Sequence, residues 1–188
     1  MNAITTPVTD PILELAAAVH WYAWTHTSPE PTQLSGHRVE RHTFTSPGKD
    51  LYLHASRQPS GEVSAYLAAP RRHTAQQRQP GWQAEVAHLP AHVTRAAIAA
   101  CTAPHPEIAN VLADAGWHLA EEVSERGRLL ERRWESNCRT RSLSWFPADQ
   151  FDDGGWTIHR PLPAGPETDL HASRFTPHAV LAALALTD

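Results

Sequence analysis

The sequence has little cysteine and only one lysine. Two cysteines in 188 residues, Cys101 and Cys138, are too few for a disulfide framework or a zinc site, so we expect two free thiols in a reducing cytoplasm. Lys49 is the single lysine, and arginine supplies the rest of the 16 basic side chains. The net charge of −4 gives the chain no general attraction to nucleic acid or to acidic membranes.

The chain also lacks a long uninterrupted apolar segment. The first residues, MNAITTPVTDPILELAAAVHWYAW, have no basic region, and Glu14 and His20 interrupt their apolar run. This start is neither a secretion signal nor a membrane span, so we expect a cytoplasmic protein without membrane contact. A hydrophobic fraction of 41% in 188 residues is typical of a globular chain with one ordinary domain or two small ones.

No catalytic constellation is recognisable. His54/Ser56 and His171/Ser173 are pairs that share a face of an extended strand, because residues two apart point the same way. Neither pair has an acidic partner or a glycine-rich turn nearby, which a catalytic serine would need. We therefore predict cross-strand packing for these pairs and no catalytic residue.

The 13 histidines do not form a metal-binding pattern. His88 and His92 have helical spacing, but Pro90 lies between them and no cysteine or carboxylate stands near enough to complete a ligand set. The acidic run at Asp152–Gly155 lacks the flanking ligands of a calcium loop, and we predict a hairpin turn there. The sequence thus predicts neither a metal nor a cofactor.

The pentapeptide LHASR occurs twice, at Leu53–Arg57 and at Leu170–Arg174, and suggests a repeat. A better register sets Ile12–Trp21 against Ile108–Trp117, two short amphipathic segments that each end at a tryptophan. The identical pentapeptides do not correspond in this register, so we interpret their match as coincidence.

The ends of the two copies match as well. In the same arrangement Pro90 corresponds to Pro177, each at the start of an alanine-rich helix. We predict two tandem repeats, residues 1–102 and 107–188, each with the order helix, strands, helix.

The segments between these anchors alternate in polarity and are separated by turn sequences. We predict an α+β fold of two antiparallel sheets flanked by short helices and packed as a pseudo-dimer. The predicted strands are Trp21–Thr27, Val39–Thr45, Leu51–Ser56, Val63–Ala69 and Trp82–Val86 in the first repeat, and Trp117–Val123, Leu129–Trp134, Leu143–Phe146, Trp156–His159 and Leu170–Arg174 in the second.

Several short motifs carry a family resemblance. The TSPG sequence at Thr45–Gly48, the Gly-Trp pairs at residues 81–82 and 116–117, and the prolines that begin the last helix of each repeat resemble the actinomycete SPDY-domain family. Gly48 stands where that motif has aspartate, and the second repeat has Ser124–Gly127 in its place. The family is a domain of unknown function, often occurring as tandem copies and common in filamentous actinomycetes and their plasmids. The resemblance therefore implies a fold and a link to mobile elements, but no catalytic residue.

The segment Arg126–Trp145 concentrates arginine and tryptophan. If residues 139–145 are extended, then Arg139, Arg141, Leu143 and Trp145 line one strand face. Guanidinium groups beside indole rings can hold single-stranded nucleic acid by phosphate contacts and base stacking. The candidate residues for a nucleic acid or another anionic partner are Arg128, Arg132, Arg133, Trp134, Arg139, Arg141 and Trp145, together with Arg71 and Arg72 from the long loop 70–80.

A second interpretation of this segment is a solvated, self-paired sheet face, and it is the one we favour for the cluster. Five glutamates at positions 121, 122, 125, 131 and 135 can form cross-strand ladders with these arginines. We expect the tryptophans at 21, 82, 117 and 156 to fill the interface between sheet and helices.

Our functional hypothesis is a non-enzymatic binding or regulatory accessory protein, associated with single-stranded nucleic acid. The alternative is a protein-interaction module or homo-oligomer that makes its contacts through strand edges and the apolar helix Pro177–Leu186.

Overall fold

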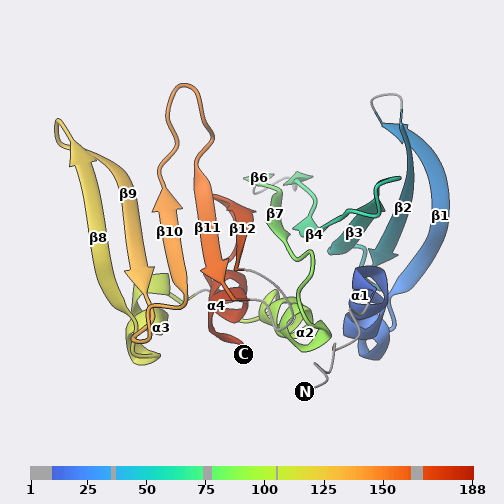
Figure 1. The fold of residues 1–188 in the computed structure, drawn as a ribbon, viewed down its shortest axis with the longest axis horizontal. Coiled ribbons are helices and arrows are strands. Elements are labelled where there is room, and N and C mark those ends of the chain that lie inside the picture. The colour runs from blue at the N-terminus through green and yellow to red at the C-terminus, as the bar shows by residue number, and fades with distance from the viewer. Residues whose placement is uncertain (1–9, 35–36, 74–77, 105, 162–166) are drawn as a thin grey trace, which may run out of the picture.

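The computed structural model describes residues 10–34, 37–73, 78–104, 106–161 and 167–188. Its dominant feature is one antiparallel sheet of ten strands with helices grouped on one side (Figure 1). The helices are α1 (Pro11–Val19), followed by the 3-10 helix η1 (His20–Tyr22), α2 (Ala91–Ala100), α3 (Ile108–Asp114) and α4 (His178–Leu186). None of these helices combines the length and the apolar character needed to cross a membrane.

The sheet has a mirrored strand order, β1-β2-β3-β4-β7 followed by β12-β11-β10-β9-β8. The first half of the chain, from α1 to α2, contributes β1 (Thr25–Leu34), β2 (His37–Thr45), β3 (Tyr52–Arg57), β4 (Val63–Ala69) and β7 (Trp82–Glu85), and also a separate two-stranded ribbon of β5 (Arg72–His73) and β6 (Arg78–Gln79). The second half, from α3 to α4, contributes β8 (His118–Glu125), β9 (Arg128–Glu135), β10 (Ser142–Phe146), β11 (Gly155–Arg160) and β12 (Thr168–Ser173).

The two halves meet through their last strands, β7 and β12, where Ala84 lies opposite Ala172. The ten strands therefore form a continuous sheet rather than two separate ones. Beneath the sheet the helices follow the same mirrored order, α3, α4, α2, α1, across the molecule (Figure 1). The predicted α+β class and antiparallel pairing are confirmed, and the two expected sheets are joined edge to edge into one.

Strict alternation explains which face of the sheet is covered. Along β3, β4 and β11, buried and partly exposed side chains alternate, as expected when helices cover one face only. Leu53, Leu67 and Ile158 are fully buried on the covered face. Each contributes about 1.5–3 kcal/mol by leaving water. We call the opposite side of the sheet the helix-free face.

Helix α4 is covered by its own chain. Its buried side chains lie on several sides of the helix, from Ala179 to Ala185, because the helix packs between the sheet and α2. The apolar helix predicted as a contact between molecules is thus an intramolecular core element, and that basis of the oligomer hypothesis is wrong. The sequence shows only that such a helix must be covered.

The entry into the first strand differs from the prediction. Trp21 lies in η1 and is 75% exposed, so it neither begins a strand nor fills the core. The chain turns at Ala23, whose φ of 53° is left-handed, and Trp24 then packs against the core. In the second half, Gly116 has the left-handed φ of 81° and the following Trp117 is buried. Trp24, not Trp21, occupies the position of Trp117, because η1 extends the first helix by one more turn.

The turns after β2 and β9 share one hydrogen-bond pattern. Ser46 N–H donates to Leu51 O and Ser136 N–H donates to Arg141 O, each at 3.0 Å. The fourth residue of each turn, Lys49 or Arg139, is left-handed with φ of 52° or 57°. The segment that corresponds to the TSPG turn is therefore Ser136–Arg141. Ser124–Gly127, predicted for this role, instead forms the hairpin between β8 and β9.

The last helices of the two halves also begin alike. Pro90 and Pro177 cap α2 and α4 with φ of −56° in both cases and ψ of 145° and 136°. Val93 and Val180, paired in the predicted register, are both fully buried one turn later. The two helices therefore begin with the same backbone turn and bury a valine at the matching position.

Candidate functional site

The tryptophans of the predicted arginine–tryptophan surface lie on the covered side of the sheet. Trp134 is 7% exposed, and Trp145 is partly buried against the core. Both rings pack against Trp156, with centroid distances of 6.3 Å and 4.7 Å. These indoles form the interior of the second half and are not presented for stacking with a base.

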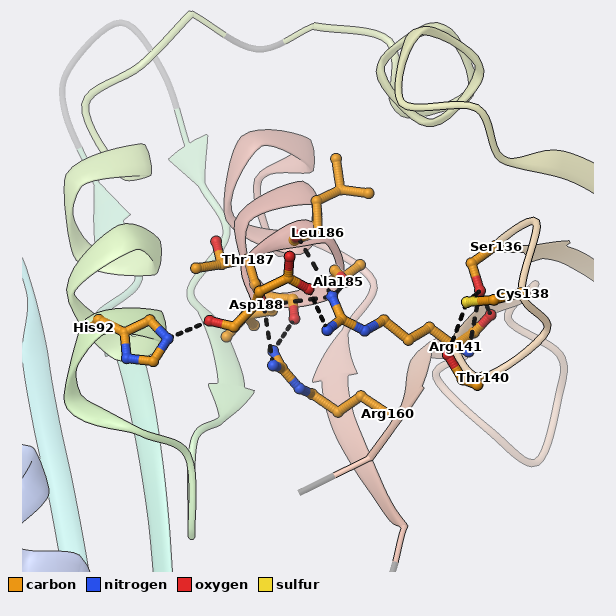
Figure 2. Close-up of polar contacts among 11 residues, drawn as sticks. His92, Ser136, Cys138, Thr140, Arg141, Arg160, Ala185, Leu186, Thr187 and Asp188 are labelled. Atoms are coloured by element: carbon orange, nitrogen blue, oxygen red, sulfur yellow. Dashed lines mark hydrogen bonds and ion pairs between the residues drawn. The ribbon is translucent and has the colours of Figure 1, made fainter. Parts of the chain in front are cut away.

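The prediction that residues 139–145 form one extended face is wrong for residues 139–141. Arg139 belongs to the turn after β9, and β10 begins only at Ser142. Arg141 turns toward the end of α4, where its guanidinium donates to Asp188 Oδ1 at 2.6 Å and approaches carbonyls of the last helical turn at 3.3–3.5 Å (Figure 2). A helix terminus, not an outside partner, receives this charge.

The remaining arginines of the cluster have carboxylate partners. Arg132 pairs with Glu122 at 2.8 Å, Arg133 with Glu135 at 3.0 Å and Arg128 with Asp149 at 3.7 Å. Only the Arg132–Glu122 pair is the cross-strand contact that the self-paired interpretation describes, because Arg133 and Glu135 lie on the same strand and Asp149 is not one of the five glutamates.

Arg71 and Arg72 are exposed but lie apart from this group. They follow β4, and β7, β12 and β11 separate β4 from β10 in the sheet. The structure therefore does not bring the nine predicted residues into one site.

A different cluster occupies the helix-free face of the first half. The rings of Tyr52 and His54 stack with centroids 5.7 Å apart and planes 6° apart. Tyr66 lies directly opposite His54 on the neighbouring strand β4. All three side chains are partly exposed, because their neighbours on the strands, such as Leu53 and Leu67, take the covered side. We call these three residues the aromatic cluster.

Two members of the aromatic cluster, Tyr52 and His54, border a hollow of about 510 Å³. This hollow extends from Tyr52 and His54 across β4 and β7 to Ser173 on β12, so it lies over the junction of the two halves. Its floor is fixed by a hydrogen bond from the Gln83 N–H to Ser173 Oγ at 3.2 Å. A flat ring that entered the hollow would meet aromatic surface on one side and polar groups on the other.

His54 is held in its neutral form. Its Nδ1 lies 3.3 Å from Thr43 Oγ1, and burial, with a smaller effect from the nearby Arg41 charge, lowers its pKa from 6.5. An uncharged imidazole that is already stacked on a phenol ring gives a flat surface for a further ring. Because the pKa is lowered, this holds at neutral pH.

Charge is unevenly distributed over the helix-free face. Near the aromatic cluster the described charged side chains include Arg41 on β2, Lys49 in the turn before Tyr52, and Glu85, which accepts the His171 N–H at 3.3 Å. Arg71 directly follows Pro70, which lines the hollow. The second half instead presents Glu131, which accepts the Ser144 hydroxyl, Asp169, which contacts His159, and the ion pair of Arg133 with Glu135. The first half is thus the more basic part of an otherwise acidic protein.

The two thiols differ in environment. Burial raises the pKa of Cys101 to about 12, and its Sγ–H donates to Ala97 O at 3.3 Å. Cys138 is exposed, and hydrogen bonds from Ser136 and Thr140 lower its pKa to about 7. Among the residues that the structure describes, no group of three or more His, Cys, Asp or Glu side chains is placed to hold a metal ion.

Sequence reasoning missed the aromatic cluster, although a signal for it is present. In the predicted strands Leu51–Ser56 and Val63–Ala69, the apolar residues of one parity mark the covered face. The side chains at the alternate positions of these strands face away from the covered side and should be small and polar. These positions instead carry Tyr52, His54 and Tyr66. Large rings at solvent-facing strand positions are the pattern to look for.

Comparisons with known proteins give no indication of what the helix-free face binds. No protein-family model matches the chain, and no curated protein and no solved structure matches it. The arrangement itself offers stacking surfaces, hydroxyl and amide groups, and a few cations at the rim.

Proposed function

We propose that the protein is a non-enzymatic accessory protein that binds single-stranded nucleic acid through the aromatic cluster. The observation that carries this proposal is the stacked pair Tyr52–His54, with Tyr66 beside it, on an uncovered face of an antiparallel sheet. Bases that are not paired stack on such rings, at about 1–3 kcal/mol for each base. The helix-free position matters because a strand of nucleotides needs an open surface to cross.

Phosphate contacts come from the basic residues around the cluster. Arg41 and Lys49 flank the stacked pair along the chain, and Arg71 follows the edge of the hollow. Three such contacts imply a logarithmic salt dependence with a slope of roughly −2, at about −0.7 for each phosphate of a single strand. The overall charge of −4 keeps binding without stacking weak.

We further propose that the chain consists of two tandem repeats, 1–102 and 107–188, that form a pseudo-dimer. The mirrored strand order, the two identical turns and the two proline caps support this. The motifs at Thr45–Gly48 and at the two proline caps support membership of the SPDY-domain family, and with it a link to mobile elements. A cytoplasmic location agrees with the free thiols at 101 and 138.

Only the first repeat would carry the nucleic-acid site. At the positions equivalent to Tyr52, His54 and Tyr66, the second repeat has Ser142, Ser144 and Thr157. One site for each chain is therefore expected.

Fluorescence anisotropy with a labelled deoxythymidine oligonucleotide of about 12 nucleotides tests the proposal. We expect saturable binding at low salt that weakens steeply from about 50 to 200 mM, and weaker binding of the matching duplex. Tyr52→Ala and Tyr66→Ala should each weaken binding roughly tenfold, since each removes a stacking surface.

Phe151→Ala is the matched control, because that ring is 87% exposed in a loop of the second half and should not affect binding. If the unmodified protein binds no oligonucleotide at low salt, or if all three variants bind alike, the nucleic-acid function is wrong. Light scattering would then measure whether the alternative, self-association, occurs.

A further inference from the structure

A second cavity, of about 520 Å³, lies on the helix-bearing side of the sheet, where the two halves meet. The turn after β2, the loop after β4, the end of α2 and the start of α4 all contribute to its wall. Its apolar surface includes Trp82 and Phe175, and its charged residues are Asp50, Arg72 and Arg174. The volume is in the range of sites for small molecules.

The equivalent space in the second half is filled by side chains. Leu53 corresponds to Leu143, since both are fully buried and each pairs with the preceding strand of its own half, β2 or β9. Two residues earlier, Leu51 corresponds to Arg141. Leu67 and Ile158 also correspond, because they pair with Leu53 and Leu143. Two residues after them, Ala69 corresponds to Arg160.

The helix ends correspond in the same way. Val93 and Val180 are equivalent, so Cys101 takes the position of Asp188. The first half thus has uncharged side chains (Leu51, Ala69 and Cys101) at all three positions where the second half has charged ones (Arg141, Arg160 and Asp188).

Two arginines fill the equivalent space in the second half, at the end of α4 (Figure 2). Arg160 is 2% exposed and donates to Leu184 O at 2.6 Å and to Thr187 O at 3.0 Å. Arg141 binds Asp188 beside it, and His92 from α2 hydrogen-bonds the Asp188 carbonyl. Positive charge and bulk together occupy the end of α4.

The end of α2 needs no such filling. The backbone N–H of Cys101 donates to Ile98 O at 3.1 Å and Thr102 Oγ1 donates to Ala99 O at 3.2 Å, so the main chain and one short side chain satisfy these carbonyls. The cavity can therefore stay open without unsatisfied helix groups around it.

We propose that this cavity binds a small anionic molecule with a flat apolar ring. Arg72 and Arg174 exceed the single carboxylate of Asp50, which is already held by the Ser46 hydroxyl at 2.6 Å. The guanidinium of Arg174 lies 4.5 Å from the Phe175 ring centroid, so cation and aromatic wall are adjacent. Trp82 supplies apolar surface for the ring of the ligand.

Amide NMR titration with two probes of opposite charge tests this site. Indole-3-acetate carries the ring and a carboxylate, and tryptamine carries the same ring and an ammonium group. We expect indole-3-acetate to give saturable shifts at the amides of Cys101, Phe175 and His178, and tryptamine to give none there. Equal shifts with both probes, or shifts spread over the whole surface, would overturn the proposal.

Arg174→Gln should weaken indole-3-acetate binding roughly tenfold, the effect of losing one charge-assisted hydrogen bond. Arg126→Gln is the matched control, because Arg126 is exposed in the β8–β9 hairpin, away from the cavity. Arg174 is itself exposed, so neither change should disturb folding. If the two variants bind the probe equally, the charge argument fails. Oligonucleotide binding is a separate measurement, and its failure would leave this result unaffected.

Discussion

The two halves of the chain share an order of elements but use equivalent positions differently. On the helix-free face the first half presents Tyr52 and His54 as a stacked pair, and the second half has the buried Ser142 and Ser144 at the same places. The strand pairing matches in the two halves, since Leu53 pairs with β2 and Leu143 pairs with β9, the preceding strand in each case. The difference is therefore one of side-chain chemistry: the first half keeps large rings for contact with solvent or a partner.

The helix-bearing side shows the opposite distribution. There the second half commits Arg141 and Arg160 to its own last helix, and the first half leaves a cavity between Leu51 and Ala69. An arginine-rich segment in a sequence thus need not give an arginine-rich surface. Buried guanidinium groups are retained where they meet several carbonyls at a helix end.

The largest effect that can test the equivalence concerns the two fully buried leucines. Leu53→Ala and Leu143→Ala should each lower the free energy of unfolding by about 3–5 kcal/mol, since each removes a packed side chain and leaves a cavity. Urea unfolding measures both. If the halves are equivalent, the two values agree closely. A loss below about 1 kcal/mol at either position would show that its environment is not that of a core.

Removal of the buried arginine should have the next largest effect. Arg160→Met should cost about 2–3 kcal/mol of unfolding free energy, because the carbonyls of Leu184 and Thr187 lose their donor inside the protein. Arg126→Met, in the exposed hairpin, is the control and should change stability by less than about 0.5 kcal/mol. An Arg160→Met protein as stable as the control would mean that Arg160 does not secure α4.

Conversion of the first half to the residues of the second should remove binding rather than stability. The double variant Tyr52→Ser/His54→Ser copies Ser142 and Ser144 onto β3. It should bind the deoxythymidine oligonucleotide at least roughly tenfold more weakly, with a change in unfolding free energy of about 1 kcal/mol or less, because both rings are partly exposed. Anisotropy and urea unfolding on the same sample separate the two effects. Unchanged affinity would show that the stacked pair is not a binding surface.

Much of the fold could be predicted from the sequence, because alternation and turn residues are local signals. The strand Val63–Ala69 lies within the predicted bounds, and most other strands are displaced by a few residues only. For the arginine–tryptophan segment, alternation shows that Trp134 and Arg133 point opposite ways but not which of them the helices cover, whereas the alternation in β3 and β4 does carry a signal for the aromatic cluster. No local pattern shows that Arg141 meets the end of α4, which lies 44–46 residues further along the chain.

The smallest expected effect concerns pH. Burial is the main cause that lowers the pKa of His54 from 6.5, so the folded state disfavours the protonated imidazole. Ser144, at the equivalent position of the second half, does not titrate. The unfolded chain then binds the proton more readily than the folded one, and stability falls as the pH drops below about 6.5 toward the folded pKa. His54→Gln should remove part of this loss, by less than about 1 kcal/mol, because the side chain is only half-buried.

Urea midpoints near pH 7 and about pH 5 measure this difference. Burial also lowers the pKa of His42, so part of the pH dependence should remain in the His54→Gln protein. The double variant His42→Gln/His54→Gln should remove more of it. Both histidines belong to the first half, so loss of stability at low pH should begin there, and amide exchange would detect it in β2 and β3 before β9 and β10. Equal onset in both sets of strands would mean that the halves respond to protons as one unit, despite their different side chains.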